Sequence, residues 1–328
     1  MLYWKNMWKE IMKKTYNKIV LIGAGAVGTS FLYSAISQGI AEQYGIIDIN
    51  TEGAFGNKLD LEDAFAALPS NGEITSGGYE LVKDADVVVI TAGRPQKPGE
   101  TRLEMVADNA KIMKTIANQI KENGFSGITL IAANPVDVMT TVYQHVTGFE
   151  ASRVISSSCA LDTSRLKLEL SKIFGLNPKE FGVFVLGEHG DSSVSTLSFG
   201  TIQGIPMKKY YEEYGLTDEK LEEMHTRVYK KAYEIIDRKR ATFYGIGAAL
   251  AEITKSILRN EKKVFATGAL LSYEYGQEGV YAAVPSVIGS EGIIKTFEFP
   301  LSKNEKANFI KSVTTLKEAT KIALDAIK

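Results

Sequence analysis

The chain has 328 residues, which is more than one compact core usually holds, so two closely joined domains are expected. Hydrophobic residues make up 45% and charged residues 23%, and 38 basic residues nearly balance 39 acidic ones. A net charge of -1 gives no electrostatic footprint for nucleic acid or an anionic membrane, and no apolar run is long enough to span a bilayer. We therefore expect neither nucleic acid nor a membrane as a partner.

Cysteine use and the N-terminus bear on location. Cys159 is the only cysteine, so no disulfide forms within the chain, and a reducing compartment, the cytoplasm, is expected. Residues 1–17 form a lysine-rich extension without the apolar core of a signal peptide or the Arg and Ser enrichment of a transit peptide. Its two tryptophans, Trp4 and Trp8, lie at helical spacing. Two interpretations stay open: a frayed or misassigned start before Met12, or an arm that packs on a neighbouring subunit.

Strand and helix patterns alternate through the first half of the chain. Residues 18–22 read K-I-V-L-I, a helical pattern follows over 26–38, and a second apolar segment covers 44–47. This order predicts one βαβ unit with a parallel pair of strands. Further strands are predicted at 87–91, 128–132 and 153–156. Because these runs are continuously apolar, we expect a sheet covered by helices on both faces.

The pattern changes after about residue 157. Helices are predicted over residues 161–174, 218–240 and 305–327, and a strand over 181–186. No repeat and no low-complexity linker separates the halves, so we expect them to pack closely.

A glycine motif follows the first predicted strand. Gly23, Gly25 and Gly28 form G-x-G-x-x-G between a strand and a helix. The first glycine permits a tight turn, the second a close approach to a pyrophosphate, and the third close packing of helix on sheet. Asp48, at the end of the second strand, would bind the adenine ribose and repel a 2′-phosphate, which favours NAD over NADP. The predicted fold is therefore α/β, with an N-terminal Rossmann dinucleotide-binding domain built on a parallel sheet (18–156) and a C-terminal α+β substrate domain (157–328).

Two further segments leave the predicted sheet at its carboxyl edge, where ligands of such folds bind. Residues 92–102 contain two prolines, two glycines and several charged or amide side chains. They are either a loop that closes over a substrate or an ordinary solvated turn. Asn134, in A-N-P-V-D, either binds a ligand or caps the next helix.

Two segments of the second half contain side chains that could act as an acid, a base or a cation. Asp162 and Arg165, in L-D-T-S-R, are three residues apart and share one helical face, as a surface ion pair would. His189, in G-E-H-G-D, follows an apolar strand and is either reactive or simply solvated. The other two histidines, His145 and His225, lie in patterns typical of helix surfaces, and no role is assigned to them.

Together these segments resemble one family, the lactate and malate dehydrogenases. The resemblance runs from about Lys18 to the C-terminus and is strongest in G-A-G-A-V-G, Q-K-P-G-E-T-R, A-N-P-V-D, L-D-T-S-R and G-E-H-G-D-S-S. Five motifs in the family's order are far more specific than any one of them. The resemblance implies a cytoplasmic, NAD-dependent oxidoreductase of glycolysis that acts on a small 2-hydroxy acid and forms a homotetramer or a dimer. It implies no metal.

The resemblance also implies roles for individual residues. His189 takes the part of the acid and base, because its pKa lies near operating pH. Asp162 orients and stabilises the imidazolium, and Arg165 grips the substrate carboxylate bidentately. Arg102 stabilises charge on the keto oxygen when its loop closes. The remaining implied contacts are Asn134 near that oxygen and the nicotinamide, Thr242 at the substrate pocket, and Val27, Tyr79, Gly93 and Arg94 at the cofactor.

Gln96 carries the argument about the substrate. Malate dehydrogenases resemble G-x-P-R-K-P-G here, with an arginine that pairs with a second carboxylate, whereas this chain reads G-R-P-Q-K-P-G. A neutral amide favours pyruvate over oxaloacetate. Arg94, and Arg240 where relatives usually have glycine, are two departures that leave malate or a bulkier 2-hydroxy acid as alternatives. A catalytically idle NAD-binding protein is the alternative from another class.

Overall fold

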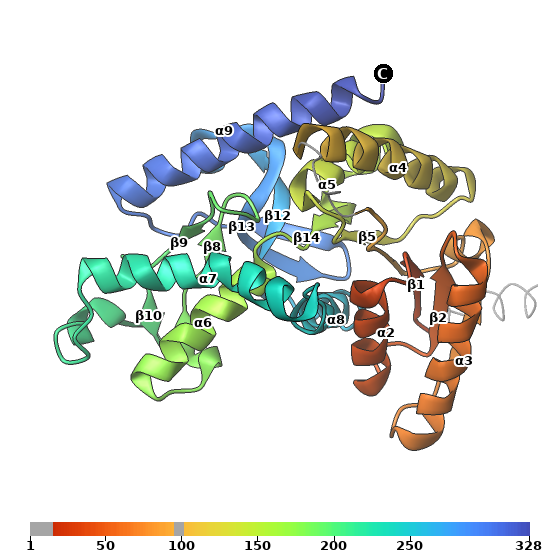
Figure 1. Cartoon of the computed structure of the whole chain (residues 1–328), viewed down its shortest axis with the longest axis horizontal. Coiled ribbons are helices and arrows are strands. Elements are labelled where there is room, and N and C mark those ends of the chain that lie inside the picture. Colours follow the sequence, from red (N-terminus) through yellow and green to blue (C-terminus); the bar gives the residue numbers. More distant parts are fainter. Residues whose placement is uncertain (1–15, 95–101) are drawn as a thin grey trace, which may run out of the picture.

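The computed structural model describes residues 16–94 and 102–328, without the side chains of 102–104. The first half alternates strands with helices, as the apolar runs predict (Figure 1). Its elements are β1 (Lys18–Ile22), α2 (Ala26–Ser37), β2 (Gln43–Ile47), α3 (Thr51–Ala67), β3 (Glu73–Ser76), η1 (Tyr79–Val82), β4 (Val87–Ile90), α4 (Arg102–Glu122), β5 (Ile128–Ile131), α5 (Val136–Thr147), η2 (Ala151–Arg153) and β6 (Val154–Ser156).

The strands of this half form a parallel sheet in the order β3-β2-β1-β4-β5-β6. The chain runs outward from β1 in one direction and then returns to β4 on the other side of β1. In open α/β sheets, ligands bind at the carboxyl end of such a reversal. The glycine turn after β1 and the loop after β4 both lie there.

The second half contributes longer helices and an antiparallel hairpin. Its elements are α6 (Ala160–Phe174), η3 (Pro178–Glu180), β7 (Phe181–Gly182), β8 (Val185–Leu186), β9 (Val194–Ser195), β10 (Thr201–Ile202), β11 (Ile205–Pro206), η4 (Met207–Tyr210), α7 (Asp218–Lys239), α8 (Tyr244–Leu258), β12 (Lys263–Ser272), η5 (Glu274–Gly276), β13 (Glu278–Gly289), β14 (Gly292–Thr296) and α9 (Lys303–Asp325).

The hairpin joins the two halves into one sheet. β12 pairs antiparallel with β6 through Gly268 and Ser156, and β13 and β14 continue the sheet to nine strands. The halves are therefore continuous in hydrogen bonding as well as packed, in agreement with the absence of a linker in the sequence.

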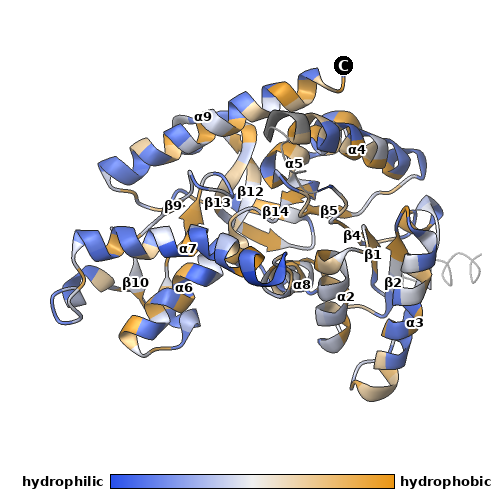
Figure 2. Ribbon diagram, in the orientation of Figure 1, coloured by the Kyte–Doolittle hydropathy of each residue, from blue (hydrophilic) through white to orange (hydrophobic). Residues whose placement is uncertain are grey.

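Helices cover both faces of the parallel sheet. Figure 1 shows α9 crossing α4 and α5 on one side, while α2 lies against α8 on the other. Along β1, Val20 and Ile22 belong to the core beneath α4, α5 and α9, and Ile19 and Leu21 to the core beneath α2 and α8. This is why the strand is apolar at every position, and Figure 2 shows the same contrast between apolar strands and more polar helices.

Most predicted elements are confirmed, with ends that move by one or two residues. The strand predicted over 181–186 is wrong as a single element, because β7 and β8 belong to different sheets. Phe184 interrupts it: its N–H donates to the Thr196 hydroxyl at 2.9 Å, and its carbonyl accepts from the Thr196 N–H at 2.9 Å. Among the described helices, none is long and apolar enough to cross a membrane.

Candidate active site

The glycine turn between β1 and α2 has the shape that the motif predicts. Gly23 has a φ of +100°, and a Cβ there would lie 2.5 Å from the Ala92 nitrogen. A Cβ on Gly28 would lie 2.2 Å from the Gly23 carbonyl oxygen, so glycine lets α2 pack against the turn. Only glycine fits at these two positions.

The middle glycine faces open space. Apart from its two chain neighbours, no atom of the described residues lies within 4 Å of a Cβ placed on Gly25. No side chain caps the N-terminus of α2, and its first turn contains no acidic residue. The N–H groups at this helix end can therefore receive an anion of the size of a pyrophosphate, as the nucleotide hypothesis requires.

Asp48 closes the same corner at the end of β2. One carboxylate oxygen accepts from the Ala24 N–H at 2.6 Å and the other from the Asn50 N–H at 2.8 Å. These bonds fix the carboxylate beside the glycine turn and leave each oxygen a lone pair for a ribose hydroxyl. The glycine turn, the uncapped N-terminus of α2 and the Asp48 carboxylate together form a site that suits a dinucleotide.

The other predicted cofactor residues lie on neighbouring loops. Val27 is half-buried in the first turn of α2, and Tyr79 is half-buried at the start of η1, where burial raises its pKa. Gly93 is exposed after β4. Arg94 pairs with Asp108 of α4 at 2.7 Å, which holds this arginine to the helix.

His189, Asp162 and Arg165 form a contiguous charged cluster. Asp162 and Arg165 come from the first two turns of α6, and both are buried. One Asp162 oxygen lies 2.5 Å from His189 Nδ1, and the other accepts from Arg165 Nη1 at 3.0 Å. The surface ion pair expected from the spacing is thus a buried one, and it also holds the histidine. The His189 side chain keeps 30% of its surface exposed, so its ring can reach a ligand.

The cluster shifts both titratable groups toward their charged forms. The Asp162 carboxylate raises the pKa of His189 above its usual value and outweighs the opposing effect of burial. Burial alone would raise the pKa of Asp162, but His189 and Arg165 together lower it. The histidine is therefore arranged to hold a proton, which is what a general acid needs.

A second carboxylate, Asp137, supports the histidine loop from beneath. It is fully buried and accepts hydrogen bonds from the Ser156 hydroxyl at 2.7 Å, the Ser158 hydroxyl at 3.0 Å and the His189 N–H at 3.4 Å. Burial raises the pKa of Asp137 to about 6, although both hydroxyls and His189 oppose this. Asp137 belongs to the A-N-P-V-D motif, but the sequence predicts no role for it because its partners lie far away along the chain.

Asn109 is a second supporting residue that no sequence motif indicated. This buried residue of α4 accepts from the Arg94 N–H at 3.0 Å and donates to the Arg94 carbonyl at 3.1 Å and the Asn134 carbonyl at 2.9 Å. It therefore ties the loop after β4 to the loop after β5. The Asn134 side chain is exposed and does not cap α5, whose N-cap is Pro135.

The structure describes only some of the remaining residues that were predicted to contact the substrate. Thr242 is half-buried between α7 and α8. Arg240 is the exposed C-cap of α7, with a φ of +72°. Arg102 begins α4, but its side chain lies outside the description, as does the whole of Gln96.

The other two histidines differ from each other. His145 is exposed on α5, as expected. His225 is partly buried, and its Nδ1 lies 2.8 Å from the Ser195 hydroxyl, so it is more than a helix-surface residue. Across residues 16–94 and 102–328, no cluster of three or more His, Cys, Asp or Glu side chains could hold a metal ion.

Comparisons with known proteins cover nearly the whole chain. The family profile for the "lactate/malate dehydrogenase, NAD binding domain" matches residues 17–156, and that for the "lactate/malate dehydrogenase, alpha/beta C-terminal domain" matches residues 159–326. The chain is 52% identical to an L-lactate dehydrogenase of Mycoplasma mobile over 97% of its own length and 100% of that relative. It is 51% identical to the L-lactate dehydrogenase of Mesoplasma florum over 96% of its length and 100% of that relative.

Solved structures agree with this. The minor L-lactate dehydrogenase of Enterococcus mundtii, in its ligand-bound form, superposes with a TM-score of 0.92 at 41% identity, covering 94% of this chain and 98% of the other. Its unbound form gives a TM-score of 0.88 at 40% identity, covering 95% and 99%.

Proposed function

The chain belongs to the lactate/malate dehydrogenase family, and from this premise we propose that it interconverts L-lactate and pyruvate with NAD. It is an oxidoreductase acting on the alcohol group of a 2-hydroxy acid. One observation carries the assignment of its reacting groups: a partly exposed histidine is held by a buried carboxylate that an arginine shares.

His189 is the proton donor and acceptor. In its protonated form it hydrogen-bonds the keto oxygen of pyruvate and gives up its proton as the alcohol forms. In the reverse direction the neutral ring takes the hydroxyl proton of lactate. Asp162 accepts the Nδ1 proton, which leaves Nε2 to face the substrate.

Arg165 binds the substrate carboxylate. Only Nη1 is engaged by Asp162 within the described part of the chain, so the other guanidinium donors stay available for a second anion. Arg102 stabilises charge on the keto oxygen, with Asn134 beside it, and Thr242 lines the pocket. As a neutral amide, Gln96 favours a substrate with a small neutral group.

NAD supplies the hydride acceptor for lactate oxidation and, when reduced, the donor for pyruvate reduction. Gly23, Gly25 and Gly28 with the N-terminus of α2 would hold its pyrophosphate, and Asp48 its adenine ribose. The rest of the cofactor would contact Val27, Tyr79, Gly93, Arg94 and Asn134.

We place the enzyme in the cytoplasm, as a glycolytic homotetramer or dimer with 18–156 as its nucleotide domain and 157–328 as its substrate domain. Exposed apolar side chains on α2, α3 and the neighbouring α8 support self-association, namely Tyr33, Phe55, Leu59 and Tyr244. Sedimentation of the purified protein distinguishes dimer from tetramer, and a monomer at micromolar concentration would contradict the proposal.

The substrate is tested by the loss of NADH absorbance on adding pyruvate, oxaloacetate or 2-ketoisocaproate. We expect pyruvate to give the highest kcat/KM. A preference for oxaloacetate would make the enzyme a malate dehydrogenase, and the absence of turnover with all three would support an idle NAD-binding protein.

A further inference from the structure

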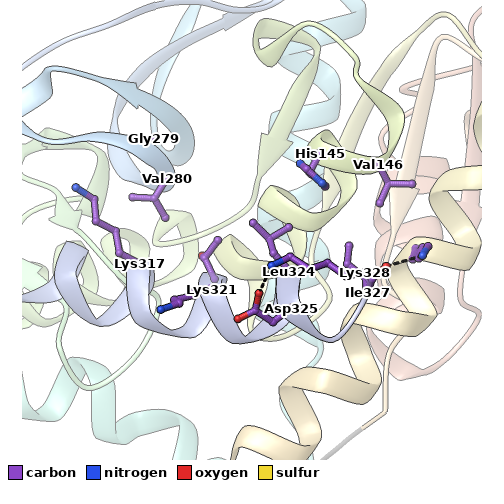
Figure 3. Close-up of a pocket in the computed structure, with 12 residues that line it drawn as sticks. His145, Val146, Gly279, Val280, Lys317, Lys321, Leu324, Asp325, Ile327 and Lys328 are labelled. Atoms are coloured by element: carbon purple, nitrogen blue, oxygen red, sulfur yellow. Dashed lines mark hydrogen bonds and ion pairs between the residues drawn. The ribbon is translucent and has the colours of Figure 1, made fainter.

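A cavity separate from the active-site cluster lies where the C-terminal part of α9 meets α4, α5 and the start of β13. It encloses about 630 Å³, and its apolar walls include Val146, Val280 and Leu324. Figure 3 shows Lys317 and Lys321 on α9 and His145 on α5 among the residues that line it. None of the residues assigned to NAD or substrate lines it.

The charges of this cavity are strongly one-sided. Among the side chains that line it, there are four lysines and one histidine against one carboxylate, Asp325. Lys328 pairs with that carboxylate at 2.6 Å, and Lys114 donates to the Ile327 carbonyl at 2.5 Å. Because the whole chain carries a net charge of only -1, this concentration of cations is local.

Lys317 and Lys321 form no ion pair within the described residues, although Lys321 lies near enough to Asp325 to help lower the pKa of that carboxyl. Within the described residues neither has a carboxylate at ion-pair distance, and Lys317 donates only to the Gln277 side chain, at 3.3 Å. They are four residues apart on one helix, a spacing at which like charges repel. Both precede the last turn of α9, so compensation of the helix dipole does not explain them.

A buried hydroxyl beside them also lacks a partner. Thr320 lines the cavity and is 7% exposed, yet its Oγ1 is buried and has no hydrogen-bond partner in the described part of the chain. Thr314 and Thr315 on the same helix donate to the carbonyls four residues earlier, at 2.9 and 3.3 Å. Thr320 does not make this usual bond, so its hydroxyl is an unsatisfied donor just beneath the cavity surface.

We propose that this cavity binds a small multiply charged anion, a phosphate compound or a polycarboxylate, through Lys317, Lys321, His145 and the Thr320 hydroxyl. The lysines act as mobile point charges, the hydroxyl donates one hydrogen bond when its side chain turns toward the anion, and apolar side chains border these contacts. The site lies outside the active centre, so its occupant would not compete with NAD or with the substrate.

Titration calorimetry of the NAD-saturated enzyme with inorganic pyrophosphate, and separately with citrate, tests the proposal. Saturation with NAD keeps the probes from the glycine turn. We expect a millimolar or tighter Kd for at least one probe. Tighter binding of pyrophosphate would indicate a phosphate compound as the ligand, and tighter binding of citrate would indicate a polycarboxylate. Lys317→Ala/Lys321→Ala should weaken binding by roughly fivefold or more, whereas Lys303→Ala/Lys306→Ala, an equal charge change in the exposed first turn of α9, should leave it unchanged.

Thr320→Val supplies a second readout that does not depend on charge. Removing an unsatisfied buried hydroxyl should raise the Tm of the anion-free enzyme by about 1–2 °C while weakening anion binding. No measurable binding of either probe by the wild type would overturn the proposal. So would binding that both lysine pairs weaken equally. NADH oxidation by pyruvate is measured separately, so failure here leaves the proposed activity standing.

Discussion

At the scale of single residues, Asp162 is shared between two cations with different tasks. It holds the ring of His189 on one oxygen and Arg165 on the other. Proton affinity and carboxylate binding are therefore coupled through one side chain, and removing its charge should disturb both.

We expect Asp162→Asn to lower kcat/KM for pyruvate by roughly 10²–10⁴. Asp162 is the main cause of the raised pKa of His189, so its loss lowers that pKa. Pyruvate reduction needs the protonated ring, and its pH profile should therefore fall at lower pH than in the wild type. Lactate oxidation needs the neutral ring and should extend to lower pH.

The exposed Asp191 gives a matched control for this change. Asp191→Asn makes the same substitution in the histidine loop, away from the ring, and should leave both profiles in place. If Asp162→Asn moves neither profile, Asp162 is not the electrostatic partner of the reacting histidine.

Asp48→Ala should relax the preference for NAD over NADP. The change removes the carboxylate that repels a 2′-phosphate, and also the acceptor that holds the Ala24 N–H. The ratio of kcat/KM for NADH and NADPH is the measurement. Asp60→Ala on α3, an exposed site with the same charge change, should keep the wild-type ratio. An unaltered preference in Asp48→Ala would mean that Asp48 does not contact the ribose.

Sequence patterns identify residues whose role is local and miss those whose partners are distant. The pairing of Asp162 with Arg165 follows from their spacing on one helix. Asp137 contacts Ser156, Ser158 and His189 only in the folded chain, where β6 and the histidine loop lie together. No local sequence pattern therefore predicts the role of Asp137.

At the scale of elements, the end of α7 contains an unusual residue. Arg240 is the C-cap in the left-handed region, where glycine is favoured. Arg240→Gly should raise the free energy of unfolding by roughly 0.5–1 kcal/mol. Arg238→Gly, two residues earlier inside the helix, should lower it by about 1 kcal/mol. Denaturant titration of both variants tests this, and destabilisation by Arg240→Gly would show that the arginine side chain itself stabilises the turn.

We propose that Gln96 sets the choice of substrate. Oxaloacetate would bring a second carboxylate into the site, which a glutamine at position 96 cannot neutralise. We expect Gln96→Arg to move the ratio of kcat/KM for oxaloacetate over pyruvate upward by at least about a hundredfold, or roughly 2.7 kcal/mol. An unchanged ratio would shift attention to Arg240, since Arg94 is held by Asp108.

The strands of the second half were harder to predict than those of the first. β12 and β13 include Gly268, Ala282, Ala283 and Pro285, residue types that are depleted in strands. Gly268 is needed because a Cβ there would lie 2.4 Å from the Asp137 carboxylate. Packing requires small residues in these strands. Because small residues have low strand propensity, the strands could not be predicted from residue type.

At the scale of the whole molecule, one sheet runs through both halves. β12 bonds to β6, and α9 packs on α4 and α5. We expect a single cooperative unfolding transition. Hydrogen exchange in increasing denaturant should give the same midpoint for amides of β5 and of β13, and a separation of the two midpoints would mean that the halves unfold independently.

The contact between Asp137 and Gly268 also constrains recombination between related genes. A crossover near residue 157 would take Asp137 and Ser156 from one parent and Gly268 and His189 from the other. Any donor with a side chain at 268 would press on the Asp137 carboxylate, and through it on the loop of the catalytic histidine. Chimeras of this family should therefore be viable only where both parents match across this contact, however well each half is formed in its own parent.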